Sequence, residues 1–273
     1  MFQYQGKTAL ITGASAGIGA EFARALAARG TNVILVARSQ DRLQTLADEV
    51  ARDHGVRAEA IAADLARPGA ARELRVAVEA RGLTVDLLVN NAGFGTHGPF
   101  ETLAPEREGA EVALNVAAVV DLTHLFLPAM LAKGDGAVVN VASTAAFQPV
   151  PYMAVYGATK AFVLSFSEAL WAEYRGRGVR VLALCPGATA TEFFDVVGTE
   201  DAALGAKRTV EQVVATGLRA LERGRPSAVD GLANYLLAQS GRFGPRGLVA
   251  RVGERVMRPR QATPRQDTVA QSR

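Results

Sequence analysis

Tyr156 and Lys160 are four positions apart in the segment "PYMAVYGATKAFVLSFSEALWAEY". This segment predicts a helix over about 152–176, on which the two side chains share one face, about one turn apart. A cation about 4 Å from a phenol favours phenolate by roughly 4 kcal/mol at an effective dielectric of about 20. That would bring a phenol pKa from about 10 toward 7, where proton transfer in either direction is favourable. A surface pair without chemical function is the alternative.

The segment "TGASAGIG", residues 12–19, joins a predicted strand to a predicted helix and carries Gly13, Gly17 and Gly19. Glycine has no Cβ, so a glycine turn can approach a pyrophosphate closely. The helix that follows offers unpaired N–H groups and its positive end to an anion. The spacing favours phosphate binding over an ordinary strand–turn–helix connection. A P-loop is excluded because no Gly-Lys-Ser/Thr follows.

Two charged residues follow the next two predicted strands. Arg38 comes directly after the second strand, which reaches the adenosine ribose in a dinucleotide-binding fold. An acidic residue there suits NAD, whereas an arginine suits the 2′-phosphate of NADP; a solvated loop arginine is the alternative. Asp64 ends the third strand, where its carboxylate either accepts a hydrogen bond from the adenine amino group or caps the next helix.

The elements that must position these residues alternate along the chain. Strands are predicted at 7–12, 32–37, within 56–64, and at 85–90, 136–143 and 179–187, and helices at 15–30, 39–55, 68–82, 105–133 and 152–176. Continuous apolar strands, each followed by a helix, indicate a parallel sheet covered on both faces. Right-handed crossovers then give a doubly wound α/β fold, in which ligands bind at the carboxyl ends of the strands.

Composition and charge narrow the possible classes of protein. The chain has 273 residues, of which 49% are apolar and 21% charged, typical of a globular protein. We predict one domain over 1–240, including a substrate loop at 188–208, and a basic extension over 241–273 that is partly helical and then disordered. The extension carries a net charge of +6 and the remaining 240 residues −3. The high pI is therefore poor evidence for nucleic-acid binding.

The cysteine and histidine content argues against metal and disulfide chemistry. The single cysteine, Cys185, lies in an apolar strand, where we expect a packed small hydrophobe. The three histidines have no metal-binding spacing, so no metal site is predicted. One cysteine allows no internal disulfide, and the first residues lack a signal-peptide pattern. We therefore expect a cytoplasmic protein.

The segment 246–258, "RGLVARVGERVMR", predicts a helix with Leu248, Val249, Val252, Val256 and Met257 on one face and arginines mostly on the other. A membrane-surface helix is one interpretation. We favour a helix that packs on its own domain or on another subunit, because Gly253 weakens an isolated helix.

Six features in register resemble the short-chain dehydrogenase/reductase family, in its shorter form of about 250 residues. They are "TGASAGIG" at 12–19, "NNAG" at 90–93, Asn115, Ser143, "YGATK" at 156–160 and "PG" at 186–187. Each is weak alone, but each falls at or near the carboxyl end of a predicted strand or on the helix that follows. The resemblance covers residues 6–225 and implies a Rossmann-type fold.

The resemblance also implies roles for individual residues. Asn115, Ser143, Tyr156 and Lys160 match the catalytic tetrad, with Tyr156 as general acid in reduction and general base in oxidation. Lys160 would lower the pKa of Tyr156 and bind the nicotinamide ribose, Ser143 would donate to the substrate oxygen, and Asn115 would hold a water. The cofactor-binding residues implied besides Tyr156 and Lys160 are Gly13, Ser15, Gly17, Ile18, Gly19, Arg38, Asp64, Leu65, Asn91, Ala92, Gly93, Pro186, Gly187, Thr189 and Thr191.

These expectations describe an NADP(H)-dependent enzyme that interconverts a carbonyl and a secondary alcohol. The substrate pocket is expected to be apolar and to suit a ketoacyl or steroid-like ketone. Its expected residues, besides the 188–208 loop, are Phe94, Thr96, Phe147, Val150 and Tyr152. The alternative is an NADP(H)-binding sensor or scaffold without turnover, which has no need of Ser143 or Tyr156. Helices 105–133 and 152–176 are the family's usual subunit contacts, so the resemblance implies a dimer or tetramer.

Overall fold

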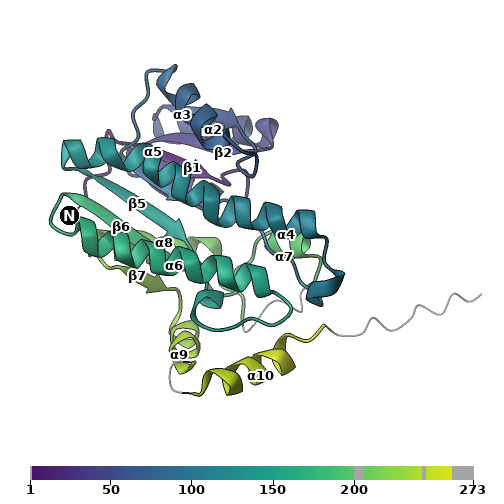
Figure 1. The fold of residues 1–273 in the computed structure, drawn as a ribbon. Coiled ribbons are helices and arrows are strands. Elements are labelled where there is room, and N and C mark those ends of the chain that lie inside the picture. The colour runs from purple at the N-terminus through teal and green to yellow at the C-terminus, as the bar shows by residue number, and fades with distance from the viewer. Residues whose placement is uncertain (1, 200–205, 242–243, 260–273) are drawn as a thin grey trace, which may run out of the picture.

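A single sheet of seven parallel strands forms the centre of the protein, whose computed structural model describes residues 2–199, 206–241 and 244–259. The strand order is β3-β2-β1-β4-β5-β6-β7. The strands are β1 (Thr8–Thr12), β2 (Asn32–Ala37), β3 (Ala58–Ala62), β4 (Leu87–Asn90), β5 (Gly136–Val141), β6 (Val179–Cys185) and β7 (Ser227–Val229). From β1 the chain adds β2 and β3 toward one edge of the sheet, and then returns to add β4 to β7 toward the other edge. This order confirms the predicted doubly wound α/β fold (Figure 1).

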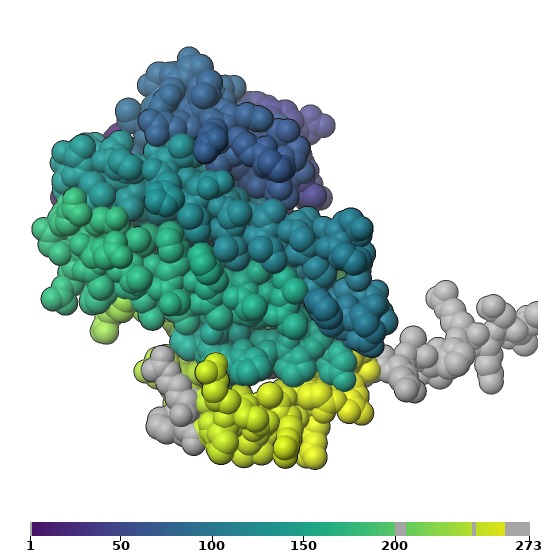
Figure 2. Space-filling view, in the orientation of Figure 1, coloured from purple at the N-terminus to yellow at the C-terminus, as the bar shows by residue number. Residues whose placement is uncertain are grey.

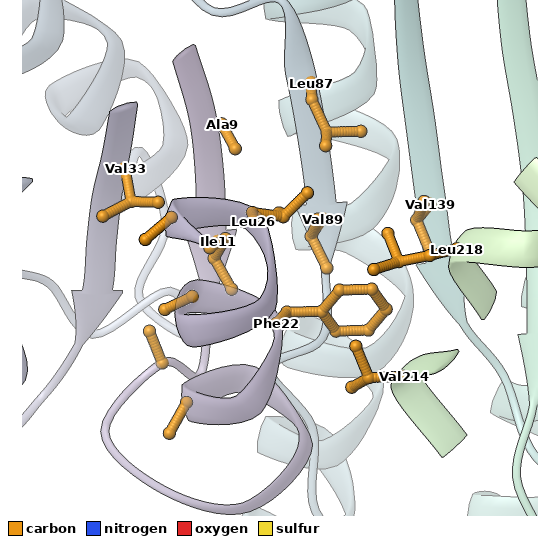
Figure 3. Close-up of a cluster of buried hydrophobic side chains, with 14 of the residues drawn as sticks. Ala9, Ile11, Phe22, Leu26, Val33, Leu87, Val89, Val139, Val214 and Leu218 are labelled. Carbon is orange, nitrogen blue, oxygen red and sulfur yellow. The ribbon is translucent and has the colours of Figure 1, made fainter. Parts of the chain in front are cut away.

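Helices cover both faces of this sheet because its central strands are apolar on both sides. All five residues of β1 are buried, for example, as are all six of β5. One face is covered by α1 (Gly17–Ala27), α2 (Gln40–His54) and α8 (Val210–Glu222), and the other by α3 (Ala70–Glu79), α5 (Ala118–Lys133) and α6 (Ala154–Tyr174). Figure 3 shows the Phe22 ring pointing from α1 toward Val214 and Leu218 of α8, with Val89 and Val139 beside it.

Helix α8 and strand β7 lie outside the elements predicted from the sequence. Thr209 and Gln212 form a reciprocal capping box at the start of α8, which marks where this helix begins. Strand β7 has only three residues, none fully buried, so it lacks the long apolar pattern of the other strands. The predicted helix 68–82 is also shorter than expected, because it begins after Gly69, which adopts a φ of 81°.

The predicted helix over 105–133 is divided into three parts. Helix α4 (Pro105–Val112) continues through a π-helical turn, η2 (Ala113–Ala117), into α5. By length and composition alone, this apolar segment could cross a membrane. Its inner face, including Leu122, Phe126 and Met130, packs against the sheet and α3. A π-turn widens the helix locally and is frequent at functional sites; here it contains Asn115.

The 188–208 loop contains one short helix, α7 (Phe193–Val197), and its residues 200–205 lie outside the described part of the chain. Its two ends are held together by backbone pairing between Thr189 and Arg208. Arg208 in turn forms an ion pair with the fully buried Asp230, at 2.8 Å from Nε to Oδ2. The loop therefore has a fixed base next to β6 and β7.

Helices α9 (Leu232–Ser240) and α10 (Arg246–Met257) follow the last strand and lie along one margin of the molecule (Figure 2). Helix α10 contacts its own domain, as we favoured from the sequence. A Cβ added to Gly253 would lie 3.2 Å from Cδ of Pro151. The Tyr152 hydroxyl donates to Glu254 Oε1 at 3.3 Å, and His97 Nε2 lies 3.0 Å from the Met257 carbonyl oxygen. The end of the chain beyond Thr263, which is predicted to be disordered, lies outside the described residues.

Candidate active site

A cleft of about 950 Å³ lies at the carboxyl ends of the strands, where the fold predicts a ligand site. It extends from the glycine turn and β2 to the C-terminal helices. Most of the predicted site residues line it: Gly13, Ser15, Gly17, Ile18, Arg38, Asp64, Leu65, Asn91, Ala92, Gly93, Ser143, Tyr156, Lys160, Pro186, Gly187, Thr189 and Thr191. Segments separated by more than a hundred residues in the sequence therefore share one cavity.

The glycine turn has the shape that an anion site requires. Gly13 and Gly17 have φ values of 65° and 57°, which favour glycine. A Cβ on Gly13 would lie 2.8 Å from Asn91 Nδ2, so no larger residue fits there. Helix α1 has no side-chain cap and no acidic residue in its first turn. Its first N–H groups are therefore available to phosphate oxygens, and the turn fits a dinucleotide.

Gly19, predicted to contact the cofactor, does not reach the cleft. It is buried, and a Cβ there would lie 2.3 Å from the carbonyl oxygen of Gly13. Its lack of a side chain lets α1 begin directly beneath the turn. Direct contact between Gly19 and a cofactor stays a prediction, since the sequence pattern does not distinguish a glycine that faces a ligand from one that permits close packing.

Asn91 and Ala92 connect the ends of the two central strands. Asn91 Nδ2 donates to the Thr12 carbonyl oxygen at 2.9 Å, and the backbone N–H groups of Asn91 and Ala92 both donate to Thr12 Oγ1 at 3.0 Å. These bonds hold the β4 end against the glycine turn, so both residues shape the cleft that they line.

The far end of the cleft contains the residues expected near the adenosine. Arg38 is exposed and makes no hydrogen bond or ion pair with the described residues. Arg42, one turn further along α2, also lines the cleft and forms an ion pair with Glu192 at 2.9 Å; sequence analysis did not single it out. Asp64 accepts from the Ala66 N–H at 3.1 Å and is not the cap of α3, which begins after Gly69.

Tyr156, Lys160 and Ser143 meet in the middle of the cleft. Lys160 Nζ lies 5.7 Å from the centroid of the Tyr156 ring and donates to the Val141 carbonyl oxygen at 2.9 Å. Ser143 follows β5, and its hydroxyl accepts from the Ala145 N–H at 3.1 Å. The Ser143 hydroxyl is also close enough to the Tyr156 phenol to lower its pKa. The three predicted residues are therefore neighbours in the cleft.

The electrostatics of this trio differ from the prediction. Burial raises the pKa of Tyr156 to about 12, against a smaller lowering by the hydrogen bond with Ser143. Burial also lowers the pKa of Lys160 to about 8. The expected lowering of the Tyr156 pKa by Lys160 is absent from the protein alone, because removal from water dominates both groups. Any phenol pKa near 7 would require further positive charge beside the phenol.

Asn115 lies behind the cleft rather than on its wall. Its side chain is buried, and Nδ2 donates to the Phe94 carbonyl oxygen at 2.9 Å and to Thr159 Oγ1 at 3.1 Å, while Oδ1 accepts from the Phe94 N–H at 3.2 Å. Both amide hydrogens are thus used to tie the 91–99 loop to α6. The π-turn places this side chain. Its role in holding a water stays a prediction, which the family resemblance implies.

Three of the expected substrate residues do not line this cleft. Thr96 belongs to the 91–99 loop but is buried, Tyr152 reaches outward to Glu254, and Phe147 faces a smaller neighbouring pocket. Phe94 and Val150 do line it. Alternation along an irregular loop has no fixed period, so the sequence could not assign which side chains face inward.

The C-terminal helices supply a wall of the cleft that was not predicted. The apolar residues of α9 and α10 that line it are Leu237, Leu248, Val249, Val252, Val256 and Met257. Five of these form the apolar helical face recognised in the sequence, but the sequence pattern did not show what this face covers. Phe193 of α7 completes the wall, with its ring centroid 5.4 Å from that of Tyr156.

A glycine cradle beside a Tyr–Lys pair, at the carboxyl edge of a doubly wound parallel sheet, is typical of a dinucleotide-dependent oxidoreductase. The sequence model described as short chain dehydrogenase matches residues 7–202. The chain therefore belongs to the short-chain dehydrogenase/reductase family, whose members are NAD(P)-dependent and act on alcohol and carbonyl groups.

Individual relatives agree with this placement. The chain is 34% identical over 191 residues to the very-long-chain 3-oxoacyl-CoA reductase of Bos taurus, covering 68% of this chain and 61% of that protein. It thus spans less than two thirds of the length of that relative. A short-chain dehydrogenase from Sphingobium yanoikuyae in complex with NADPH has a TM-score of 0.78 at 35% identity, covering 94% of this chain and 98% of that chain. The bulky-bulky ketone specific alcohol dehydrogenase from Comamonas testosteroni has a TM-score of 0.74 at 30% identity, covering 96% and 98%.

Proposed function

We propose that the protein is an NADP(H)-dependent oxidoreductase that interconverts a bulky apolar ketone and its secondary alcohol. The observation that carries this proposal is the single cleft itself. Arg38 and the glycine turn lie toward one end, Tyr156, Ser143 and Lys160 in the middle, and the apolar wall of α10 at the other end. A dinucleotide and a ketone would therefore meet beside the Tyr156 hydroxyl.

The bound nicotinamide would supply or accept the hydride, and this chain's residues handle the proton and the geometry. In reduction, the Tyr156 hydroxyl gives its proton to the substrate oxygen, which the Ser143 hydroxyl orients. Lys160, held by the Val141 carbonyl, places a positive charge beside the phenolate that forms. In oxidation the same phenolate removes the proton. The raised pKa of Tyr156 keeps it protonated in the protein alone, as reduction requires.

Arg38 supports NADP(H) over NAD(H). Its guanidinium lies at the end of β2, free to pair with a 2′-phosphate, and the second cation Arg42 lies one turn away. An acidic residue, which would repel that phosphate, is absent from this position. The similar Sphingobium yanoikuyae structure, which contains NADPH, agrees with this preference.

The apolar character of the far wall supports a bulky substrate. Leu248, Val252 and Val256 are each about half exposed and line the cleft, as Leu237 does from α9. Exposed apolar side chains that face one cavity are expected to be covered by an apolar ligand. The acyl-CoA and bulky-ketone relatives fit a ketoacyl or similarly large ketone.

Exposed apolar side chains on the helices next to the site also support a homo-oligomer. Val112 at the end of α4 and Phe162 on α6 are 44% and 42% exposed. We propose that a second copy covers this face, as the family resemblance implies.

Changing Val252 to Asp is expected to lower kcat/KM for a bulky apolar ketone by about ten- to a hundredfold, because burying a valine side chain contributes about 1.5–3 kcal/mol. A short ketone that does not reach α10 should be reduced at an unchanged rate. NADPH oxidation at 340 nm with a graded ketone series measures both. Val76→Asp is the matched control, since Val76 is 65% exposed on α3 and outside the cleft. Equal loss for short and bulky ketones would contradict the proposed wall.

Gly93→Ala is expected to lower kcat/KM by about tenfold to a hundredfold, since small displacements of catalytic groups cost about this much. A Cβ there would lie 2.9 Å from Asn115 Oδ1, so the Asn115 side chain must shift, and it would contact Lys160 Nζ at 3.4 Å. Gly109→Ala is the matched control, because its added Cβ would meet no atom within 4 Å apart from its chain neighbours and its own helix backbone. If the two variants had the same kcat/KM, Gly93 would not hold the catalytic residues in place.

A screen of ketones and aldehydes with NADPH tests the proposed function directly. Turnover of bulky apolar ketones is expected, with NADPH preferred over NADH. If no carbonyl compound were reduced while NADPH bound tightly, the protein would instead be a non-catalytic NADP(H) sensor or scaffold.

A further inference from the structure

Two buried carboxyl groups share one hydroxyl behind the proposed active site. Thr96 Oγ1 donates to Glu111 Oε2 at 3.1 Å and to Glu108 Oε1 at a shorter distance. Glu111 is fully buried, and its Oε1 atom has no hydrogen-bond partner among the described residues. One hydroxyl hydrogen serves only one acceptor fully at a time. The cluster is therefore short of donors, and burying charge this way is costly unless a cation lies nearby.

The position of this cluster connects it to Lys160. Glu111 lies near the end of α4, one helical turn before Asn115 of the π-turn. Thr96 belongs to the same loop as Gly93, whose added Cβ would touch both Asn115 Oδ1 and Lys160 Nζ. The cluster does not line the cleft, whereas Lys160 does. Glu111 is thus placed to act on Lys160 from the protein interior, without contact with substrate.

The charged groups that act on Glu111 come from its own helix and from α6. Burial raises the pKa of Glu111 to about 7, and the negative charge of Glu108 on the same helix adds to this rise. The Thr96 hydrogen bond and the positive charge of Lys160 on α6 both lower the Glu111 pKa. Burial lowers the pKa of Lys160 to about 8, and Glu111 and then Cys185 on β6 oppose this lowering. The negative charge of Glu111 also raises the pKa of Tyr156.

Building on the proposed function, we propose that Glu111 is a positioning residue that acts through Lys160, its carboxylate holding the buried Lys160 side chain in the ammonium form. Lys160 needs such a counter-charge because its hydrogen-bond acceptor, the Val141 carbonyl, is neutral. Thr96 keeps the Glu111 carboxylate in place. Glu108 accepts a hydrogen bond from the same Thr96 hydroxyl, but it is not one of the groups that raise the pKa of Lys160.

The sign of the expected pH effect follows from removing this one charge. Glu111→Gln keeps the size of the side chain and removes its negative charge, so the ammonium of Lys160 loses support and its pKa falls. The pKa of Tyr156 falls as well, because Glu111 raises it. Reduction needs Lys160 charged and Tyr156 protonated. The loss of kcat at alkaline pH should therefore begin at a lower pH, whether Lys160 or Tyr156 is the group whose deprotonation causes it.

The direct test is NMR titration of the full-length protein labelled with 13C at lysine Cε. The chain contains four lysines, Lys7, Lys133, Lys160 and Lys207. The signal that disappears in Lys160→Arg is the signal of Lys160. In Glu111→Gln the Lys160 signal is expected to titrate about one pH unit or more below its wild-type value. The matched control Glu108→Gln removes a carboxylate from the same hydroxyl and should not lower that value. Equal lowering in both variants, or none in Glu111→Gln, overturns the proposal.

A second variant keeps the test decisive if Glu111→Gln does not fold. Thr96→Val removes the hydrogen bond that favours the Glu111 carboxylate, so the Lys160 titration should again move to lower pH; an unchanged value would refute the role. The titration needs no substrate. If the wild-type protein reduced no carbonyl compound, the proposed function would fail, and the NMR result would still decide whether Glu111 controls the charge of Lys160. If the protein does reduce a carbonyl compound, the alkaline limb of the kcat–pH profile must also move to lower pH in these variants.

Discussion

Tyr156→Phe is expected to lower kcat for ketone reduction by about 10²- to 10⁴-fold, the usual contribution of a positioned general acid. The substitution removes only the hydroxyl. The ring stays packed against Phe193, and Lys160 keeps its bond to the Val141 carbonyl. The loss should therefore fall on the proton-transfer step. Steady-state kinetics with NADPH and a bulky ketone measures it, and NADPH binding followed by fluorescence should change little.

Tyr152→Phe is the matched control for this experiment. It makes the same chemical change four positions earlier, where the hydroxyl reaches Glu254 outside the cleft. Its kcat is expected to stay within about twofold of wild type, since this long, partly buried hydrogen bond lies away from the reacting atoms. If Tyr156→Phe kept most of the activity, another proton donor would have to serve the substrate oxygen, and the proposed mechanism would be abandoned.

Arg38→Asp is expected to reduce the preference for NADPH over NADH, measured as the ratio of kcat/KM values, by about 10²-fold. A charge-assisted hydrogen bond contributes about 1.5–3 kcal/mol, and the new carboxylate repels the 2′-phosphate in addition. The same carboxylate can accept from the 2′-hydroxyl of NADH, so activity with NADH should hold or rise. Most of the change should appear in the KM for NADPH.

Arg72→Asp is the matched control for the cofactor experiment. It makes the same change of charge on α3 and lies outside the cleft, so it tests whether overall charge alone alters the preference. The ratio should stay close to wild type in this variant. An unaltered ratio in Arg38→Asp would show that Arg38 is a solvated loop residue, as the alternative interpretation holds.

The sequence predicted most of the strands and the Tyr156–Lys160 pair correctly, because both depend on local patterns. The run "NVILVA" coincides with β2, and the Tyr156–Lys160 spacing places both side chains in the cleft because a helix has a fixed period. The order of the motifs along a doubly wound sheet also brought the glycine turn and Ser143 to the same edge. The short β7 was missed because three residues carry too little pattern.

Residue type and spacing alone thus determined the parallel fold, the glycine cradle and the identity of the chemically active pair. Only the tertiary structure decided that α10 forms the apolar wall, that Gly19 packs closely against Gly13, and that Glu111 lies behind Lys160. It also decided that burial raises the pKa of Tyr156. These outcomes depend on which distant segments exclude water from a given atom, and desolvation has no signature in the order of neighbouring residues.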